Sequence, residues 1–330
     1  KQKINIDEDD IFKFLAIVLS LIASFRWKVG GDWETYLITF ERSKLSLINF
    51  DWSLVFELIN YIFSSLQTGV YGVNLFVSSI FFLALYRFGK LLNFNLVLIL
   101  LISFSLVYFN GIMGYVRQTL SLVFLIFSIE FLIKDKRYSS LFMFSLAIFT
   151  HIASIALFPI YFYLLIKNLK LIFVIMLIIL FSSILGITRL EVAYNEFVFK
   201  GMISLGAFFR SIPLLICSLI YLIYRKKYFL NTKIFRFITD YLCFLSIFLI
   251  ILILLSPAFS AIADRLSFYM VIFQIIVIGQ IFSKLIKYTN KNYLHYLTFT
   301  SISYFSLTFS WLIFGDYSVY WLDYNFLYLR

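Results

Sequence analysis

Long apolar runs recur along this 330-residue chain, and they limit what it can fold into more than any other feature. Runs such as residues 170–187 approach the length of about 20 residues that a helix needs to cross a bilayer. Hydrophobic residues make up 62% of the chain and charged residues 14%, whereas soluble domains are about half apolar and a quarter charged. We therefore predict an all-α, polytopic integral membrane protein.

Apolar runs punctuated by basic residues predict about eleven membrane crossings. We expect them at residues 11–27, 70–86, 94–109, 114–133, 139–150, 152–166, 170–187, 210–224, 237–256, 266–283 and 294–314. Residues 53–67 are apolar but interrupted by Glu57, Asn60 and Gln67, which is typical of a short interfacial or re-entrant helix. A β-barrel is excluded, because runs such as LIFVIMLIIL do not alternate apolar and polar residues.

The stretch 139–166 is too long for one upright crossing, since a straight helix of that length would measure about 42 Å. Basic residues flank both of its ends, and basic flanks are usually cytoplasmic. Two short helices with a bend near His151 satisfy both constraints. This bend would lie on the outer side of the membrane or partway down from it.

The net charge of +11 does not indicate nucleic-acid binding, because most lysines lie in short loops between apolar runs. Such lysines set topology and contact lipid headgroups. The expected outer side carries mainly arginine instead, at Arg26, Arg42, Arg117, Arg189, Arg210, Arg265 and Arg330. Arginine suits phosphate and carboxylate recognition. We expect one transmembrane domain over 1–330, with outer loops at about 28–69 and 188–209.

The segment SFRWKVGGDWETY places polar groups directly after the first apolar run. Asp32 and Tyr36 are four residues apart, so on a helix they share a face, and Gly30 and Gly31 allow a sharp turn before it. Asp32 fits two interpretations. It is either a helix N-cap or a carboxylate that orients or deprotonates a sugar hydroxyl.

Two further polar residues interrupt apolar helices. Arg117 lies near the outer end of the expected span 114–133, where it either snorkels to the interface or contacts an anion inside the bundle. His151 lies at the proposed bend. It is either a packing residue or a neutral imidazole able to act as a general base.

The segment SPAFSAIADRLSFYM opens another expected span from the outer side. Asp264 and Arg265 either pair with each other or bind substrate, and Tyr269 follows Arg265 by one turn. Arg210 opens a further span from the same side. No spacing typical of a metal site or a disulfide occurs, and no nucleotide-binding motif is present, so we expect no metal and no cofactor.

Residues from five distant stretches map to the outer half of the membrane in this topology: Asp32, Arg117, His151, Arg210 and Arg265. We expect them to gather into one anion-holding site. Arginines, a carboxylate and an imidazole at the lipid–water boundary suit a lipid diphosphate substrate.

The chain resembles the EpsG family of polysaccharide polymerases, relatives of the Wzy-type O-antigen and capsule polymerases. The resemblance rests on FRWKVGGDWETY, FELINYIF, GYVRQTLSLVFLIFSIEFLI, LAIFTHIASIALFP, ADRLSFY and the aromatic tail YSVYWLDYNFLYL, in this order over nearly the whole chain. It implies a GT-C-like glycosyltransferase of the bacterial inner membrane, with its active site facing the periplasm or exterior. The expected donor and acceptor are oligosaccharide repeat units carried on undecaprenyl diphosphate.

On this interpretation the catalytic residues are His151, Asp32 and Arg117. Arg117, helped by Arg210 and Arg265, would hold the donor diphosphate, and either His151 or Asp32 would accept the proton of the acceptor hydroxyl. Residues expected to bind substrate are Arg26, Tyr36, Arg210, Asp264, Arg265 and Tyr269. Trp33, Trp311 and Trp321 are expected to be exposed, facing sugar rings or the interface. Membrane lipid and a chain-length regulator protein are candidate partners.

Two other functions remain open. An O-antigen ligase, or another polyprenyl-phosphate-dependent glycosyltransferase, would use the same donor chemistry. A flippase for the same lipid-linked oligosaccharide would also need a polar site in the membrane. Transporters, however, often show repeated halves, and the chain shows no internal repeat.

Overall fold

The computed structural model describes residues 7–45, 53–165, 206–228, 232–255, 259–288, 293–314, 318–322 and 325–326. The expected crossing at 170–187 and most of the expected outer loop at 188–209 lie outside them. The described chain is helical apart from a two-residue antiparallel ladder, so the prediction of an all-α fold is confirmed.

Contacts within the chain divide it into two compact units. The first contains the described parts of residues 1–48, 57–126 and 278–330, and the second those of 49–56 and 127–277. In chain order the elements are α1 (Glu8–Ser24), β1 (Arg26–Trp27), α2 (Trp33–Lys44), α3 (Leu54–Ser65), α4 (Gly69–Leu92), α5 (Leu96–Ser103), the π-helix η1 (Phe104–Ile112), α6 (Val116–Ile133), α7 (Arg137–Ile148), the 3₁₀ helix η2 (Ile152–Leu157), α8 (Phe158–Leu165), α10 (Gly206–Tyr228), α11 (Lys233–Leu255), α12 (Ser260–Ser267), the 3₁₀ helix η5 (Phe268–Met270), α13 (Val271–Tyr288), α14 (Tyr293–Phe314), α15 (Val319–Leu322) and β2 (Asn325–Phe326).

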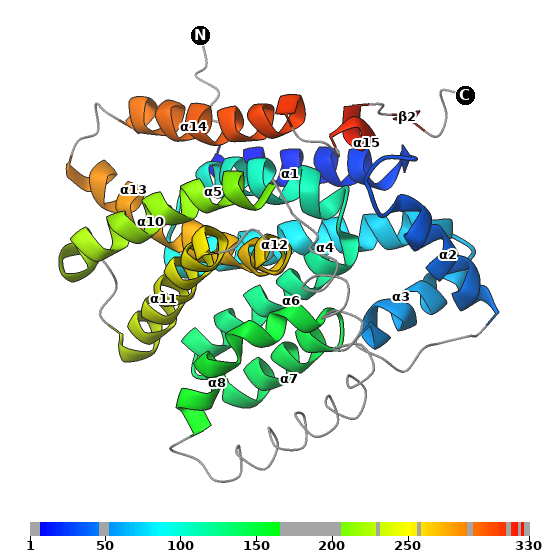
Figure 1. Ribbon diagram of the computed structural model, residues 1–330, viewed down its shortest axis with the longest axis horizontal. Coiled ribbons are helices and arrows are strands. Elements are labelled where there is room, and N and C mark those ends of the chain that lie inside the picture. The colour runs from blue at the N-terminus through cyan, green and yellow to red at the C-terminus, as the bar shows by residue number, and fades with distance from the viewer. Residues whose placement is uncertain are drawn as a thin grey trace. The chain divides into compact units, whose positions relative to one another are not determined.

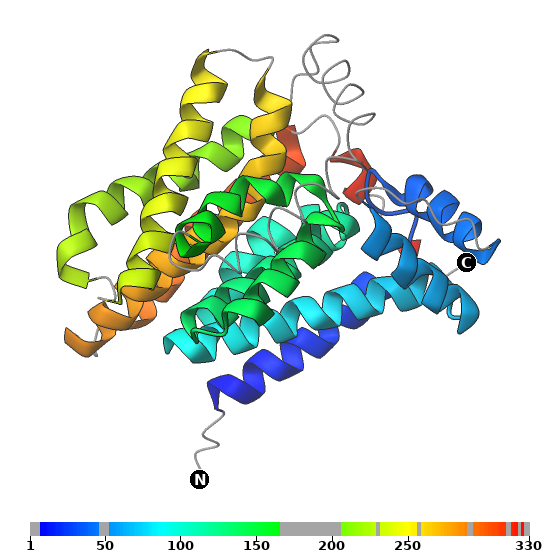
Figure 2. The same ribbon diagram turned by 90° about the horizontal axis from the view of Figure 1, so that it is seen from below.

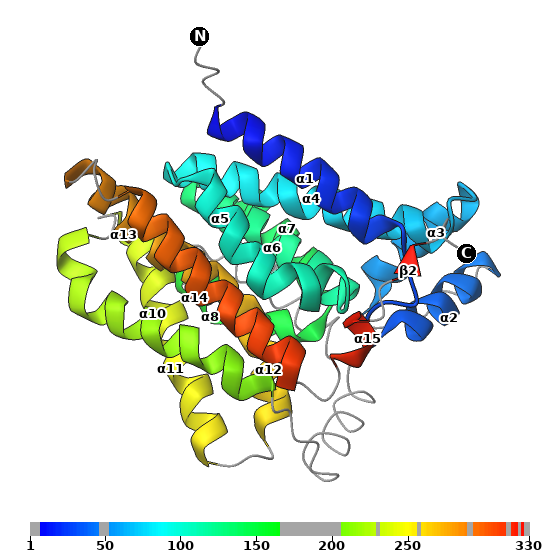
Figure 3. The ribbon, with the colours of Figure 1, turned by 90° about the horizontal axis from the view of Figure 1, so that it is seen from above.

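The first unit is built around α1, α4 and α5, which pack against one another, while α14 packs on α5 and η1 (Figures 1 and 3). Asn93 ends α4 in the left-handed conformation, and the Asn95 side chain then caps α5 by accepting from the backbone N–H of Leu98 (2.8 Å). Gly89 lets the two helices approach, because a Cβ there would lie 2.7 Å from Ile99 Cδ1. The corner between α4 and α5 is therefore closely packed.

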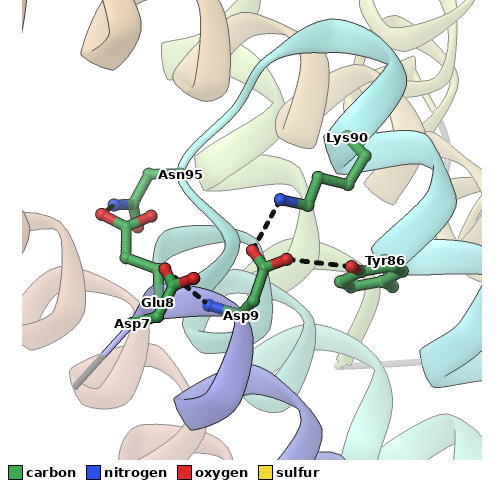
Figure 4. Close-up of polar contacts among 6 residues, drawn as sticks. All are labelled: Asp7, Glu8, Asp9, Tyr86, Lys90 and Asn95. Atoms are coloured by element: carbon green, nitrogen blue, oxygen red, sulfur yellow. Dashed lines mark hydrogen bonds and ion pairs between the residues drawn. The ribbon is translucent and has the colours of Figure 1, made fainter.

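Acidic residues in the first turn of α1 join it to α4 and α5 (Figure 4). Lys90 Nζ of α4 lies 2.6 Å from Asp9 Oδ1, and Tyr86 donates to the same carboxylate (3.0 Å). Asn95 donates to Glu8 (2.6 Å). The hydrogen bond from Lys90 is the main reason that the pKa of Asp9 is lowered. Negative charge also favours the N-terminal end of a helix, so these residues stabilise α1 in two ways.

In the second unit α10, α11 and α12 pack together, and Figure 2 shows the yellow α11 beside the yellow-green α10. The helix α7 ends at Ile148, and a new helical segment begins at Ile152 and continues as α8. His151 lies in this break with an extended backbone. The predicted bend between two short helices near His151 is thus confirmed.

Four helical segments of the described chain are long and apolar enough to cross a membrane: Gly69–Leu92, Val116–Ile133, Lys233–Leu255 and Ser260–Lys284. Shorter apolar helices cover Leu54–Ser65, Leu96–Ile112 and Ile152–Tyr161. These findings agree with a membrane protein, while the number of eleven crossings stays a prediction. The short helix expected within 53–67 is present as α3.

Candidate functional site

A sharp turn after α1 places Asp32 at the start of α2. Arg26 and Trp27 of β1 pair with Phe326 and Asn325 of β2. The segment FRWKVGGDWETY and the aromatic tail near the C-terminus therefore meet in one ladder. Gly30 follows with φ +99°, and its N–H donates to the carbonyl of Tyr320 (2.9 Å). A Cβ at Gly30 would lie 2.1 Å from the carbonyl oxygen of Met113, so only glycine permits this approach to the corner before α6.

The turn brings together three of the predicted site residues, Asp32, Tyr36 and Arg117, which we call the Tyr36 cluster. The Tyr36 hydroxyl donates to Asp32 Oδ2, and the backbone N–H of Arg117 donates to the same hydroxyl. The donor–acceptor distance is 3.5 Å in each case. Asp32 and Arg117 are half-buried, whereas Tyr36 is buried. The predicted shared face of Asp32 and Tyr36 is confirmed. Asp32 stands at the N-cap position of α2 without a capping hydrogen bond from its side chain.

Burial raises the pKa of Tyr36 far above its ordinary value of 10.0, and the Asp32 charge raises it further. The positive charges of Arg117 and Arg26 act in the opposite direction. The phenol therefore stays protonated at neutral pH and serves as a hydrogen-bond donor to Asp32. The cluster combines a carboxylate that can accept a proton with a guanidinium that can hold an anion.

The side chain of Arg26 stabilises the turn after α1 through hydrogen bonds to backbone carbonyls. Its side chain is buried, at 1% exposed, and donates to the carbonyls of Ala23 (2.8 Å) and Val29 (3.3 Å). It also donates to Asn74 Oδ1 of α4 (3.4 Å), and its guanidinium lies 5.5 Å from the ring centroid of Trp33. These contacts hold the end of α1 against α4. Asn74 was not predicted, although a polar residue in the apolar run of α4 was a visible signal.

Trp321 connects the C-terminal segment to the same corner. Its Nε1–H donates to the carbonyl of Phe109 in η1 (2.7 Å). A Cβ on Gly114 would lie 2.5 Å from the Trp321 ring, and one on Gly31 would lie 3.7 Å from it. The ring thus packs between the turn before Asp32 and the turn before Arg117.

The expected exposure of the tryptophans is wrong for Trp33 and Trp321, which are 3% and 6% exposed, while Trp311 is half-buried. Trp33 packs edge-on against Trp27 (5.9 Å between ring centroids) and lies beneath Arg26. Interior packing and a carbonyl partner, rather than sugar rings, account for these two side chains.

In the second unit His151 and Tyr269 are brought together. Tyr269 OH lies 2.9 Å from His151 Nδ1, although the residues are 118 positions apart. Both are buried. The ring of His151 is therefore held by a tyrosine that the sequence placed among the substrate-binding residues.

Asp264 forms an ion pair across two helices. Arg210 Nε of α10 lies 2.9 Å from Asp264 Oδ1 of α12, a partner that the sequence did not predict. The side chains of Arg210 and Asp264 are 16% and 13% exposed. Arg265, the next residue along α12, is exposed. The pair joins α10 to α12.

Within the described residues no three His, Cys, Asp or Glu side chains are arranged to hold a metal ion. Cys217 and Cys243 are buried free thiols.

Comparison with protein families connects this geometry to a known group of proteins. The EpsG family model matches residues 11–326, which is nearly the whole chain. The match includes both the Tyr36 cluster and the His151–Tyr269 pair. No curated protein and no solved structure matches the chain.

Proposed function

Since this chain belongs to the EpsG family, a family of polymerase-like membrane proteins related to the Wzy type, we propose that it polymerises oligosaccharide repeat units carried on undecaprenyl diphosphate. The reaction would take place at the outer face of a bacterial inner membrane and build an O-antigen, capsule or exopolysaccharide. The observation that carries the proposal is the Tyr36 cluster, in which Tyr36 joins the carboxylate of Asp32 to the start of the helix that bears Arg117.

The proposed reaction is a glycosyl transfer without a nucleotide sugar. The acceptor hydroxyl loses its proton to a carboxylate or imidazole, and its oxygen forms a new bond to the anomeric carbon of the donor. The bond from that carbon to the diphosphate oxygen breaks, and the lipid diphosphate leaves with the electron pair. An arginine that holds the diphosphate stabilises the charge that develops on it.

The described contacts sort the arginines by role. The guanidinium of Arg26 is occupied by carbonyl oxygens, and Arg210 is paired with Asp264, so we assign both to holding the fold. Arg117 is half-buried, and its backbone N–H contacts the Tyr36 hydroxyl that donates to Asp32. We assign Arg117 to the donor diphosphate.

Replacement of Arg117 tests this function. In a null strain complemented with Arg117→Ala, we expect polymer ladders to collapse toward single repeats, with polymerisation reduced on the order of 100-fold. Arg117→Lys keeps the charge without the planar fork and should restore only part of the length. Lys44→Ala, an exposed cation that pairs with Glu41 (2.6 Å), is the matched control and should leave the ladder unchanged.

The products separate the rival functions. Purified protein that lengthens a defined lipid-linked repeat unit in detergent is a polymerase, because a flippase forms no glycosidic bond. Accumulation of unattached full-length polymer in the null strain would indicate a ligase instead. A full-length ladder from well-expressed Arg117→Ala would remove Arg117 from the mechanism.

A further inference from the structure

Helices α10 and α11 meet at an end that is rich in basic residues. α10 ends at Tyr228 and α11 begins at Lys233, and the two helices pack against each other within the second unit. Residues 221–240 contain five basic residues and one acidic residue: Arg225, Lys226, Lys227, Lys233, Arg236 and Asp240. We call the end formed by Arg225, Lys226, Lys233 and Arg236 the basic end.

The one carboxylate of this stretch is already occupied. Tyr221 donates to Asp240 Oδ1 (2.6 Å), and Arg225 forms an ion pair with Asp240 through Oδ2. Both carboxylate oxygens therefore have partners on α10, and these contacts join the two helices. A single negative charge offsets one of the cations, so the basic end keeps an excess of positive charge.

Several cations elsewhere on the same expected side of the membrane are neutralised by nearby carboxylates. They form the pairs Lys90–Asp9, Lys134–Glu130 and Arg137–Asp135 (2.6, 2.7 and 2.9 Å). Lys226 and Lys233, by contrast, are exposed, and neither pairs with a carboxylate among the described residues. These two lysines are therefore available to an external anion.

An exposed apolar stripe on α10 leads to Lys226. Four exposed residues follow one another at spacings of three or four, which places them on one helix face: Ile212, Leu215, Leu219 and Leu222. Lys226 follows Leu222 by four residues and continues the same face. This face of α10 is an apolar surface that ends in a positive charge.

Helix α11 shows the same arrangement at its start. Its exposed apolar stripe comprises Phe244, Phe248, Ile251 and Leu255. Lys233 lies eleven residues before Phe244, which is about three helical turns, so it shares that face. The helix is long and apolar enough to cross a membrane, so its first residue would lie at the depth of the lipid headgroups.

These features fit a ligand that has an anionic head and hydrocarbon chains. We propose that the basic end binds an anionic phospholipid, with Lys226 and Lys233 at its phosphate group and its acyl chains along the exposed stripes of α10 and α11. A soluble anion would contact the lysines but would gain nothing from the apolar stripes. This binding does not depend on the proposed polymerase function.

Lipid retention by the full-length protein tests the proposal. Protein purified in detergent is titrated with phosphatidylglycerol or with phosphatidylcholine of the same acyl chains, and bound lipid is counted by native mass spectrometry. We expect phosphatidylglycerol to bind about 25-fold more tightly, because each lysine near a charged headgroup contributes about fivefold. Added salt should reduce this preference. Equal retention of the two lipids would overturn the proposal.

A double variant locates the site. Lys226→Gln combined with Lys233→Gln should reduce the retention of phosphatidylglycerol to that of phosphatidylcholine. Both side chains are exposed, so the variant should unfold at the same temperature as the parent when no lipid is added, which checks its fold. The matched control, Lys44→Gln combined with Lys136→Gln, removes the same charge from exposed lysines outside α10 and α11. An equal loss of lipid in this control would make net charge responsible and contradict the proposal.

Two further measurements separate a phospholipid from a free anion. Glycerol 3-phosphate carries a phosphate without acyl chains, and at equal concentration it should not displace phosphatidylglycerol. Leu219→Ser combined with Leu222→Ser interrupts the apolar stripe but leaves both lysines, and it should weaken retention about tenfold. Displacement by glycerol 3-phosphate, or unchanged retention in the leucine variant, would indicate a site for free anions and argue against a lipid.

Discussion

At the scale of single residues, the geometry of the candidate site depends on one position that tolerates no side chain. Gly30 has φ +99°, and its backbone packs directly on the carbonyl of Met113. The neighbouring Gly31 has ordinary space around it, with the nearest atom to a Cβ at 3.7 Å. The pair Gly30–Gly31 suggested a turn from the sequence. Gly30 is the indispensable one because of its contact with Met113, which is more than 80 positions away in the chain. The periodicity of the sequence could not reveal that contact.

Alanine substitutions should separate these two glycines. Gly30→Ala combines a clash at 2.1 Å with an unfavourable φ, and we expect it to lower stability by roughly 1–3 kcal/mol or more and to shorten the polymer. Gly31→Ala should change the midpoint of thermal unfolding in detergent only slightly. Equal midpoints for the two variants would contradict the close approach of this turn to Met113.

At the scale of elements, the π-helix η1 is the segment that the apolar pattern did not predict. The sequence indicated a regular span at 94–109, but the helix widens from Phe104 to Ile112 just before the corner that carries Arg117. Side chains from the C-terminal part of the chain satisfy its carbonyls: Thr308 donates to Ser105 (2.9 Å) and Trp321 to Phe109 (2.7 Å). Hydropathy cannot distinguish a π-helix from an α-helix, because the same apolar residues occur in both geometries.

Trp321→Phe tests this connection while keeping an aromatic ring. It removes the Nε1–H that donates to the half-buried carbonyl of Phe109, and the loss of such a hydrogen bond costs about 0.5–1.5 kcal/mol. We expect lower thermal stability in detergent and shorter polymer. Trp311→Phe alters the ring that packs 5.1 Å from Trp321 and serves as the control with the smaller effect. A larger loss from Trp311→Phe would argue against a role for the Trp321 hydrogen bond.

At the scale of the whole molecule, the chain forms two compact units, and each holds one part of the predicted site. The Tyr36 cluster lies in the unit that contains both ends of the matched region, and the His151–Tyr269 and Arg210–Asp264 pairs lie in the other. Hydropathy predicted a helical membrane protein, and the resemblance of six short motifs predicted the family that the comparison shows. The division into units could not be read from hydropathy, because apolar runs look alike wherever they pack.

Membrane orientation makes a prediction for the first unit. The helix α1 measures about 25 Å and separates the exposed Asp10 from the turn before the exposed Glu34. In spheroplasts we expect a membrane-impermeant maleimide to label Glu34→Cys at once and Asp10→Cys only after permeabilisation. The buried native thiols Cys217 and Cys243 should leave the parent protein unlabelled. The reverse pattern would place the Tyr36 cluster on the cytoplasmic side.

The sequence by itself determined the helical membrane character, the break at His151, the shared face of Asp32 and Tyr36, and the family. These properties follow from local spacing, hydropathy and the order of short motifs. Only the tertiary structure decided that Arg26 is occupied by carbonyls, that Asp264 pairs with Arg210, that Trp33 and Trp321 are buried, and that Tyr269 holds His151. Each depends on partners distant in the chain or on side-chain direction, and a polar residue in an apolar run does not reveal which partner satisfies it.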